Sequence, residues 1–266
     1  MNDWRSFDTI AETYERIHAP RIAEPARDLV ALTAPPAGCR VLDVGTGTGV
    51  AAAAAREAVG PGGFVVGIDP SIGMLSVGAR SRGHLGLVAA EAIDLPFRDG
   101  AFDVVTANFV IGFFTKYQTA LFDMLRVLKR GGRLAVSTWT GRPDDLQRTW
   151  RSLVEEVVQQ ELLQDAMTTA APWEDRFADP MRLEQALRDA GLRPVRVERR
   201  EYHFRYSQEE YVTGRASAAM GRFVREMLGE EAFERFLGRA REVFAERFAD
   251  PVNDFRDVLL AVGIRQ

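Results

Sequence analysis

The stretch VLDVGTGTGV at residues 41–50 constrains the fold more than any other part of the chain. A short apolar run is followed by three alternating glycines, Gly45, Gly47 and Gly49, and then by an alanine-rich segment. Glycine accepts a positive φ and lets the backbone approach a ligand with no Cβ in the way. In a doubly wound sheet, the turn after the first strand is a usual ligand cradle. The sequence therefore predicts a strand, a ligand-binding turn and a helix in this order.

The apolar pattern that follows alternates between two periods. Short runs rich in valine and leucine predict strands at 41–44, 64–68, 85–88, 102–107 and 133–139. Segments of helical period lie between them and predict helices at 51–59, 74–80 and 118–128. This alternation, with nearly continuous apolar strands, is typical of a parallel sheet covered by helices on both faces.

The flanking segments predict additions to this sheet. Apolar residues at helical spacing from Phe7 to Ile17 predict an N-terminal covering helix within residues 1–20. After residue 140 we expect a further helix around Trp150, a helix at 181–190 and a sixth strand in PVRVERREYHFRY. A last strand is expected at 255–264, antiparallel to its neighbour. The helices between these two strands would form a lid.

No linker or internal repeat divides the chain, so we expect one domain over residues 1–266. Its core would span 38–140, with helical lid insertions at 142–178 and 207–250. The amphipathic stretch 233–248 is expected to pack the lid onto the sheet. A homodimer contact and a membrane contact through this stretch are the alternatives.

Composition excludes several classes of function. The net charge of −4 argues against a nucleic-acid partner, because affinity for nucleic acid depends on basic side chains that neutralise phosphates. A single cysteine, Cys39, and three scattered histidines give no metal-binding spacing, so no metal is expected. We expect a cytoplasmic protein, because no apolar run has the length of a signal peptide or a membrane span.

Charged residues near the glycine turn describe its ligand. The spacing GTGTGVA fits a dinucleotide fingerprint poorly, and no phosphate-binding GxxxxGK motif is present. Asp43 beside the turn would disfavour a pyrophosphate and favour a cationic ligand. Asp69 ends the second strand, where an acid can accept both hydroxyls of a ribose, although capping the next helix is an alternative role. Glu91 follows the third strand, where an adenine would lie. Together these residues predict a nucleoside ligand whose tail is cationic and carries no phosphate.

Four segments carry a resemblance to a known family. The segments VLDVGTGTG, VVGIDPSIGML, EAIDLPFRDGAFDVV and LRVLKRGGRLAVSTW occur in order, after the N-terminal WRSFDTIAETYERIHAP. Over about residues 4–140 the chain resembles the class I methyltransferases that use S-adenosylmethionine (SAM), in the small-molecule group that includes ubiquinone and menaquinone biosynthesis enzymes. The resemblance implies an α/β, Rossmann-like sheet of seven mostly parallel strands with the last antiparallel. Residues 141–266 resemble only the variable substrate-binding portion of that family.

The resemblance also implies roles for individual residues. SAM would be the cofactor, with its methionine end at the glycine turn and Asp43, its ribose at Asp69 and its adenine at Glu91. The complete set that would bind it comprises Tyr14, Asp43, Gly45, Thr46, Gly47, Gly49, Asp69, Pro70, Met74, Glu91, Ala92, Asn108 and Phe109. Tyr14 has an alternative role, as part of the apolar face of its helix.

The acceptor and the catalytic base are less well specified. Many relatives carry a histidine after strand four, but Gly112, Phe113 and Phe114 stand there in this chain. The remaining candidate bases are His203 and His18, and the identity of the base stays open. Many aromatic residues in the expected pocket favour a bulky apolar or aromatic acceptor. Two other functions remain: a nicotinamide-dependent reductase, or a SAM-binding protein that catalyses a rearrangement or acts as a non-catalytic partner.

Overall fold

The computed structural model describes residues 4–266 and contains a seven-stranded sheet in the order β3-β2-β1-β4-β5-β7-β6. The strands are β1 (Arg40–Val44), β2 (Phe64–Asp69), β3 (Gly86–Ala89), β4 (Phe102–Asn108), β5 (Leu128–Trp139), β6 (Leu192–Tyr206) and β7 (Val252–Arg265). Strands β1 to β5 pair in parallel, and β7 runs antiparallel to both β5 and β6. The predicted α/β class, with an antiparallel last strand, is therefore confirmed.

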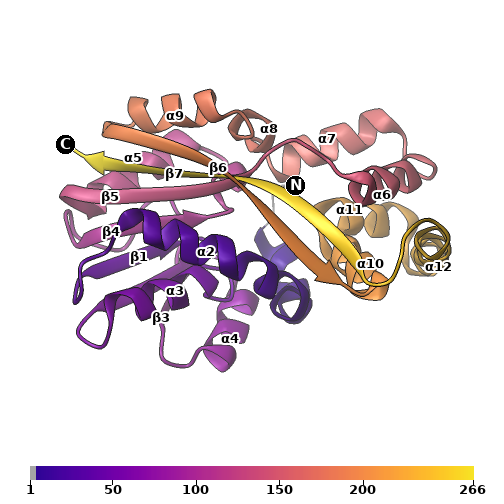
Figure 1. Ribbon diagram of the computed structural model, residues 1–266, viewed down its shortest axis with the longest axis horizontal. Helices are drawn as coiled ribbons and strands as arrows, with labels where there is room; N and C mark the ends of the chain where they lie inside the picture. Colours follow the sequence, from indigo (N-terminus) through magenta and orange to yellow (C-terminus); the bar gives the residue numbers. More distant parts are fainter. Residues whose placement is uncertain (1–3) are drawn as a thin grey trace.

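Helices cover both faces of the sheet (Figure 1). The central ones are α3 (Val50–Val59), α4 (Ile72–Ser81), α5 (Tyr117–Val127) and α9 (Pro180–Asp189), and η3 (Ile111–Phe113) is a short 3-10 turn. Consecutive residues of β1 point to opposite faces, as a strand requires. Val41 packs with Ala52 and Val59 of α3, whereas Leu42 packs in the cluster that contains Leu121 of α5. Burial on both faces explains why the strand has no polar alternation.

The N-terminal helix is longer than the predicted 1–20. From Trp4 the chain forms η1 (Trp4–Ile10), α1 (Ala11–Thr13), the π-helical turn η2 (Tyr14–His18) and α2 (Ala19–Thr33). The predicted end is wrong because Pro20 lies in the first turn of α2, where a missing N–H costs nothing. Pro25 lies inside α2, and the helix continues past it. Residues 1–3 of the predicted segment lie outside the described residues.

A second group of helices packs around its own core at one end of the sheet (Figure 1). It comprises α6 (Asp145–Glu155), α7 (Gln160–Ala170), α10 (Gln208–Ser217), α11 (Ala219–Leu228) and α12 (Glu230–Arg247), while α8 (Glu174–Phe177) lies between α7 and α9. Trp150, Tyr211, Phe233 and Phe244 are among its fully buried side chains. The apolar stripe predicted along 233–248 thus packs within this helical lid.

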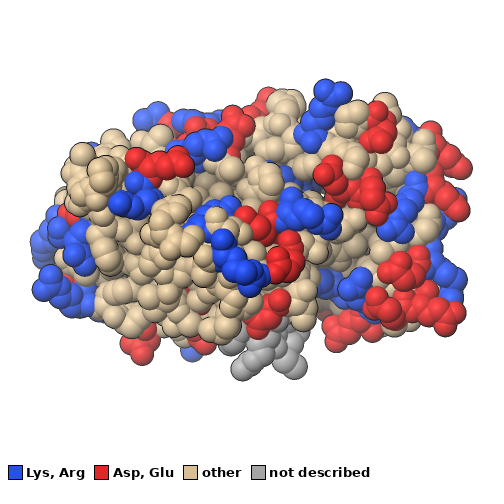
Figure 2. Space-filling model, turned by 90° about the horizontal axis from the view of Figure 1, so that it is seen from below, with Lys and Arg blue, Asp and Glu red and all other residues tan. Residues whose placement is uncertain are grey.

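On the face of the molecule drawn in Figure 2, charged side chains of both signs are interspersed among uncharged residues. Among the described residues, no helix combines the length and the apolar composition needed to cross a bilayer. The same residues hold no group of three or more side chains arranged to bind a metal ion.

Candidate functional site

The glycine turn after β1 is shaped by two backbone positions that exclude side chains. Gly45 and Gly47 have φ values of 67° and 56°, in the left-handed region. A Cβ on Gly45 would lie 2.4 Å from Cγ2 of Val110, so no larger residue fits there. A Cβ on Gly47 would face Cε1 of Tyr14 at 3.9 Å. Both glycines line the cavity described below.

Asp43 lies under this turn rather than in the cavity. Its side chain is buried, and its carboxylate accepts hydrogen bonds from the hydroxyls of Thr46 and Thr106, each at 2.7 Å. Burial raises the pKa of Asp43 to about 6, and the two hydroxyls partly oppose that shift. Thr46 is itself buried against Gly67. Asp43 and Thr46 therefore hold the turn from below, and Gly49 is likewise absent from the cavity lining.

Asp69 joins the turn after β1 to the turn after β2. Its carboxylate accepts hydrogen bonds from the backbone N–H groups of Gly47 and Ser71, each at 2.9 Å. Burial raises the pKa of Asp69 to about 6 against the effect of these two donors. Asp69 lines the cavity, and each of its oxygens retains a lone pair for a further donor. The capping role falls to Ser71, whose hydroxyl accepts the Met74 N–H.

One cavity of about 350 Å³ lies at the carboxyl ends of β1 to β5, within the range typical of ligand sites. Most of the predicted cofactor-binding residues line it: Tyr14, Gly45, Gly47, Asp69, Pro70, Met74, Glu91, Ala92, Asn108 and Phe109. Sequence reasoning missed other lining residues, among them Phe7, Ile10, Val110, Ser217 and Arg222. The covering segment and the lid contribute most of these, and their positions carry no motif.

Asp8 is a further residue that the sequence did not reveal. Its carboxylate accepts hydrogen bonds from the Ser71 hydroxyl at 2.6 Å and from the Gly73 N–H at 2.7 Å. A Cβ on Gly73 would lie 2.7 Å from Cα of Asp8, so the close approach requires glycine. This contact attaches η1 to the start of α4 and brings Phe7 and Ile10 over the cavity.

The carboxyl end of β4 is fixed by a serine on β5. Ser137 donates a hydrogen bond to Oδ1 of Asn108 at 2.7 Å and accepts one from the Phe109 N–H at 2.9 Å. Phe109 has a φ of 54°, an uncommon value for a residue with a side chain. Its ring stacks on that of Trp139 with 4.0 Å between centroids. Asn108, Phe109 and Trp139 thereby present a rigid wall to the cavity.

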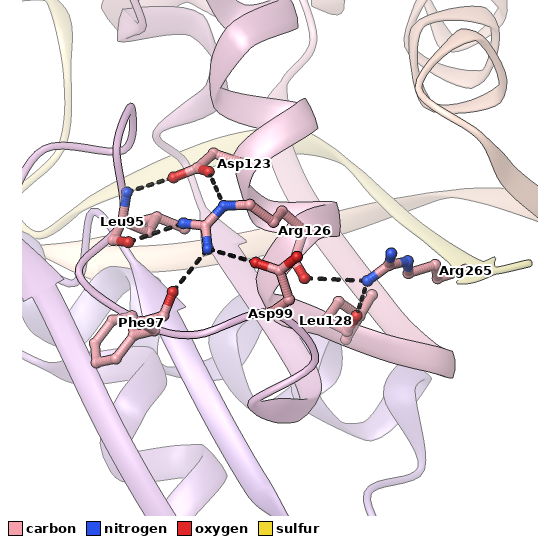
Figure 3. Close-up of polar contacts among 7 residues, drawn as sticks. All are labelled: Leu95, Phe97, Asp99, Asp123, Arg126, Leu128 and Arg265. Atoms are coloured by element: carbon pink, nitrogen blue, oxygen red, sulfur yellow. Dashed lines mark hydrogen bonds and ion pairs between the residues drawn. The ribbon is translucent and has the colours of Figure 1, made fainter.

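The loop after β3 is held by Arg126 of α5 (Figure 3). Its guanidinium donates to the carbonyl oxygens of Leu95 and Phe97 at 2.9 and 2.7 Å and pairs with Asp99 and Asp123. Asp123 also accepts the Leu95 N–H. The network fixes residues 95–99, and Glu91 and Ala92 stand just before them on the cavity wall.

Of the two predicted base candidates, one lines the cavity and the other does not. His203 is exposed on β6, packs against Phe255 and does not line the cavity, so the prediction that it faces the pocket is wrong. His18 lines the cavity, with its Nε2 3.0 Å from the Ser217 hydroxyl.

His18 is held as a neutral imidazole. Burial and then the positive charges of nearby arginines lower the pKa of His18 to about 3. The Ser217 hydroxyl donates its only proton to the Gly214 carbonyl at 3.0 Å. The Nε2 of His18 must therefore donate to Ser217, which leaves the lone pair on Nδ1. The Tyr14 ring lies 5.4 Å from the imidazole.

Comparison with known proteins agrees with this geometry. Residues 42–136 match a family model described as a methyltransferase domain. A demethylmenaquinone methyltransferase of Clavibacter sepedonicus is 33% identical over 202 residues, covering 71% of this chain and 81% of that protein. Another, from Renibacterium salmoninarum, is 43% identical over 103 residues, covering 39% of this chain and 42% of that protein.

A solved structure shows the same fold. The YcgJ protein of Bacillus subtilis aligns with a TM-score of 0.58 at 20% identity, covering 91% of this chain and 99% of that one. The match to the Clavibacter protein extends over most of both chains, and the matched methyltransferase domain contains the end of β1, the glycine turn and β2 to β4. The chain therefore belongs to the class I SAM-dependent methyltransferases, the family that includes the demethylmenaquinone methyltransferases.

Proposed function

We propose that this methyltransferase acts on a small, bulky aromatic acceptor of quinone-like chemistry. One observation carries the proposal: a single cavity is lined by carboxylates beside β2 and β3 and by aromatic rings beside β4 and β5. The demethylated menaquinones named by its relatives have the size and apolar character that such a wall accommodates.

The polar half of the cavity fits SAM residue by residue. Gly45 and Gly47 leave a cradle that a Cβ would fill, which suits the amino-acid end of the cofactor. Asp69 offers free lone pairs beside Pro70, which suits the two ribose hydroxyls, and Glu91 and Ala92 would contact the adenine. Asn108 and Phe109 would then border the sulfonium. Asp43, Thr46 and Gly49 would act indirectly, by shaping the turn.

Bound SAM supplies a methyl group activated by its sulfonium, and displacement leaves S-adenosylhomocysteine (SAH) as the methyl bonds to the acceptor. The residues of the chain align the two partners and exclude water, an effect worth about 7–11 kcal/mol in favourable systems. Phe7, Ile10 and Tyr14 of the N-terminal segment cover the cofactor half. The stacked pair of Phe109 and Trp139 would fix the plane of an aromatic acceptor.

His18 is the imidazole that we place beside the acceptor, in preference to His203. Its Nδ1 can accept a hydrogen bond from an acceptor hydroxyl, but a group with a pKa near 3 is a weak base at neutral pH. We therefore assign His18 a positioning role toward the acceptor rather than that of a general base.

Two measurements test the proposal together. Isothermal titration should show SAM binding, and a quinol such as a prenylated 1,4-naphthohydroquinone should release SAH in a coupled assay. SAM binding without SAH release from any quinol or phenol would contradict methyl transfer to this class. It would favour a rearrangement or a non-catalytic role instead. NADPH binding in place of SAM would support the reductase.

The proposal includes a small molecule, rather than nucleic acid, as acceptor. The net charge of −4 and the mixture of charges on the face in Figure 2 support this choice. We also propose that the enzyme acts in the cytoplasm. Light scattering after size-exclusion chromatography would decide between a monomer and a homodimer.

A further inference from the structure

A cluster of buried polar side chains lies beside the aromatic end of the cavity, between α8, α10, β6 and β7. Trp139 connects the two, because its ring lines the cavity and stands 5.9 Å from the guanidinium carbon of Arg256. Ser217 and His18 line the cavity as well, and the charge of Arg215 on α10 acts on His18, so the cluster adjoins the cavity without itself lining it. The cluster comprises Arg21, Tyr206, Tyr211, Arg215, Asp254 and Arg256.

Two of its three arginines share one carboxylate. The Asp254 side chain is fully buried and pairs with both Arg21 and Arg256, the latter at 3.1 Å. Arg21 also stands over the ring of Tyr206, with 4.8 Å between the guanidinium carbon and the ring centroid. Neighbouring Asp144 is occupied by the backbone N–H groups of Gln147 and Phe255 at 2.8 and 3.2 Å. Asp254 and Asp144 are therefore both engaged by other groups, although Oδ1 of Asp254 has no hydrogen-bond partner.

Arg215 is the arginine that this arrangement leaves without a counterion. Within residues 4–266 it forms no ion pair, and its Nε is buried without a hydrogen-bond partner. The hydroxyls of Tyr206 and Tyr211 are buried without partners too, and Tyr211 is only 2% exposed. A partly buried cation whose Nε is buried without a partner, and two buried hydroxyls that lack acceptors, are costly unless a ligand satisfies them.

Glu174 of α8 is the carboxylate that faces Arg215 from across the cluster. Burial raises the pKa of Glu174, and the charges of Arg215 and Arg256 partly oppose the shift. Its side chain nevertheless forms no ion pair within the described part of the chain. Glu174 is therefore within electrostatic range of Arg215 but does not pair with it.

We propose that Arg215, assisted by the hydroxyls of Tyr206 and Tyr211, binds a carboxylate carried by the aromatic acceptor. This inference rests on the proposed function, because it extends the same acceptor site. An arginine can hold a carboxylate by two parallel hydrogen bonds, which fixes orientation as well as affinity. The site would then select aromatic acids over neutral aromatic compounds of the same size.

A matched pair of ligands tests the inference. The protein is loaded with SAH, and the binding of 1-hydroxy-2-naphthoate and of 1-naphthol is measured by titration. These compounds differ only in the carboxylate. We expect the naphthoate to bind at least tenfold more tightly. In Arg215→Gln this preference should disappear. The affinity for the naphthoate should fall at least tenfold, while the affinity for naphthol should change by less than twofold.

Two controls separate the possible failures. Arg235→Gln, at an exposed arginine of α12 that pairs with Glu231, should leave both affinities unchanged. Arg215→Lys keeps the charge and should recover part of the preference. Equal affinity for both compounds, binding of neither, or an unchanged preference in Arg215→Gln would overturn the inference. SAH affinity is measured in every variant. In this experiment, only a failure of the wild-type protein to bind SAH would count against the proposed function.

Stability supplies a readout that needs no turnover. Because Arg215 lacks a counterion in the free protein, Arg215→Gln should melt at the same temperature as wild type or higher. The naphthoate should raise the melting temperature of the wild type and leave that of Arg215→Gln unchanged. A variant that melts much lower than wild type would indicate that Arg215 is a structural cation and would contradict the assignment.

Discussion

At the scale of single residues, Asp69 has the largest expected effect on cofactor binding. It accepts the Gly47 and Ser71 N–H groups and faces the proposed ribose position. Asp69→Ala would leave these donors and the ribose hydroxyls without a charged acceptor. We expect SAM affinity to fall at least tenfold, in line with about 1.5–3 kcal/mol for a hydrogen bond to a charged group. Calorimetry measures this, with the exposed Glu57→Ala as control. An unchanged affinity would refute the nucleoside placement.

The same carboxylate gives a pH dependence whose sign can be worked out. Burial raises the pKa of Asp43 and Asp69 to about 6, above the value of about 3.9 for an unfolded aspartate. The folded protein therefore binds more protons than the unfolded chain between about pH 4 and pH 6. These two groups consequently lower the free energy of unfolding as the pH rises through that window.

Binding of cationic SAM should have the opposite dependence. Protonation of Asp43 and Asp69 removes negative charge near the sulfonium, so SAM affinity should decrease as the pH falls below about 6. Calorimetric titrations at about pH 7.5 and pH 5 measure the effect, and Asp69→Asn should show a shallower decrease because one titrating group is gone. Equal dissociation constants at the two pH values would show that neither carboxylate acts on the cofactor.

At the scale of secondary-structure elements, local sequence patterns predicted the strands that are buried on both faces. The predicted 102–107 and the observed Phe102–Asn108 differ by one residue, because the apolar run coincides with burial. The end of the N-terminal helix was missed because Pro20 and Pro25 are compatible with its geometry. Asp8, Ser137 and Ser217 could not be found from pattern, since each acts through partners far away in the sequence.

The loop after β3 shows how an element is positioned by a distant side chain. Arg126→Gln would remove the pairs with Asp99 and Asp123 and the bonds to the Leu95 and Phe97 carbonyls (Figure 3). Buried acceptors would be left unsatisfied, and we expect a loss of about 2–3 kcal/mol in the free energy of unfolding. Urea denaturation measures this loss.

The matched control for this prediction is Arg151→Gln on α6, whose pair with Glu155 is exposed. Such pairs contribute about 0.3–0.5 kcal/mol, so the control should be nearly neutral. SAM affinity should also weaken in Arg126→Gln, because Glu91 and Ala92 stand on the same loop. Equal stability of the two variants would show that other contacts hold the loop.

At the scale of the whole molecule, the chain buries its hydrophobic side chains in two regions. One lies between the sheet and its covering helices, and the other lies among α6, α7, α10, α11 and α12. In the proposed arrangement, the cofactor half of the cavity is built from the sheet and the N-terminal segment, whereas Ser217 of the lid faces the acceptor half. SAM and the acceptor should therefore stabilise different parts of the molecule.

Hydrogen exchange can resolve this division, since ligand binding lowers the frequency of local opening. SAM should slow the exchange of amides in residues 4–18, 45–49 and 69–74, which adjoin the polar half of the cavity. It should leave exchange in α6, α7 and α12 unchanged, because their side chains pack in the core of the lid.

Addition of 1-hydroxy-2-naphthoate should then slow exchange in α10 and α11. At a given SAM concentration, Asp69→Ala should lose the protection by SAM. Arg215→Gln should lose the protection by the naphthoate. If SAM protected the lid helices as strongly as the glycine turn, the two halves would form one cooperative unit, and the separate assignment of cofactor and acceptor regions would be wrong.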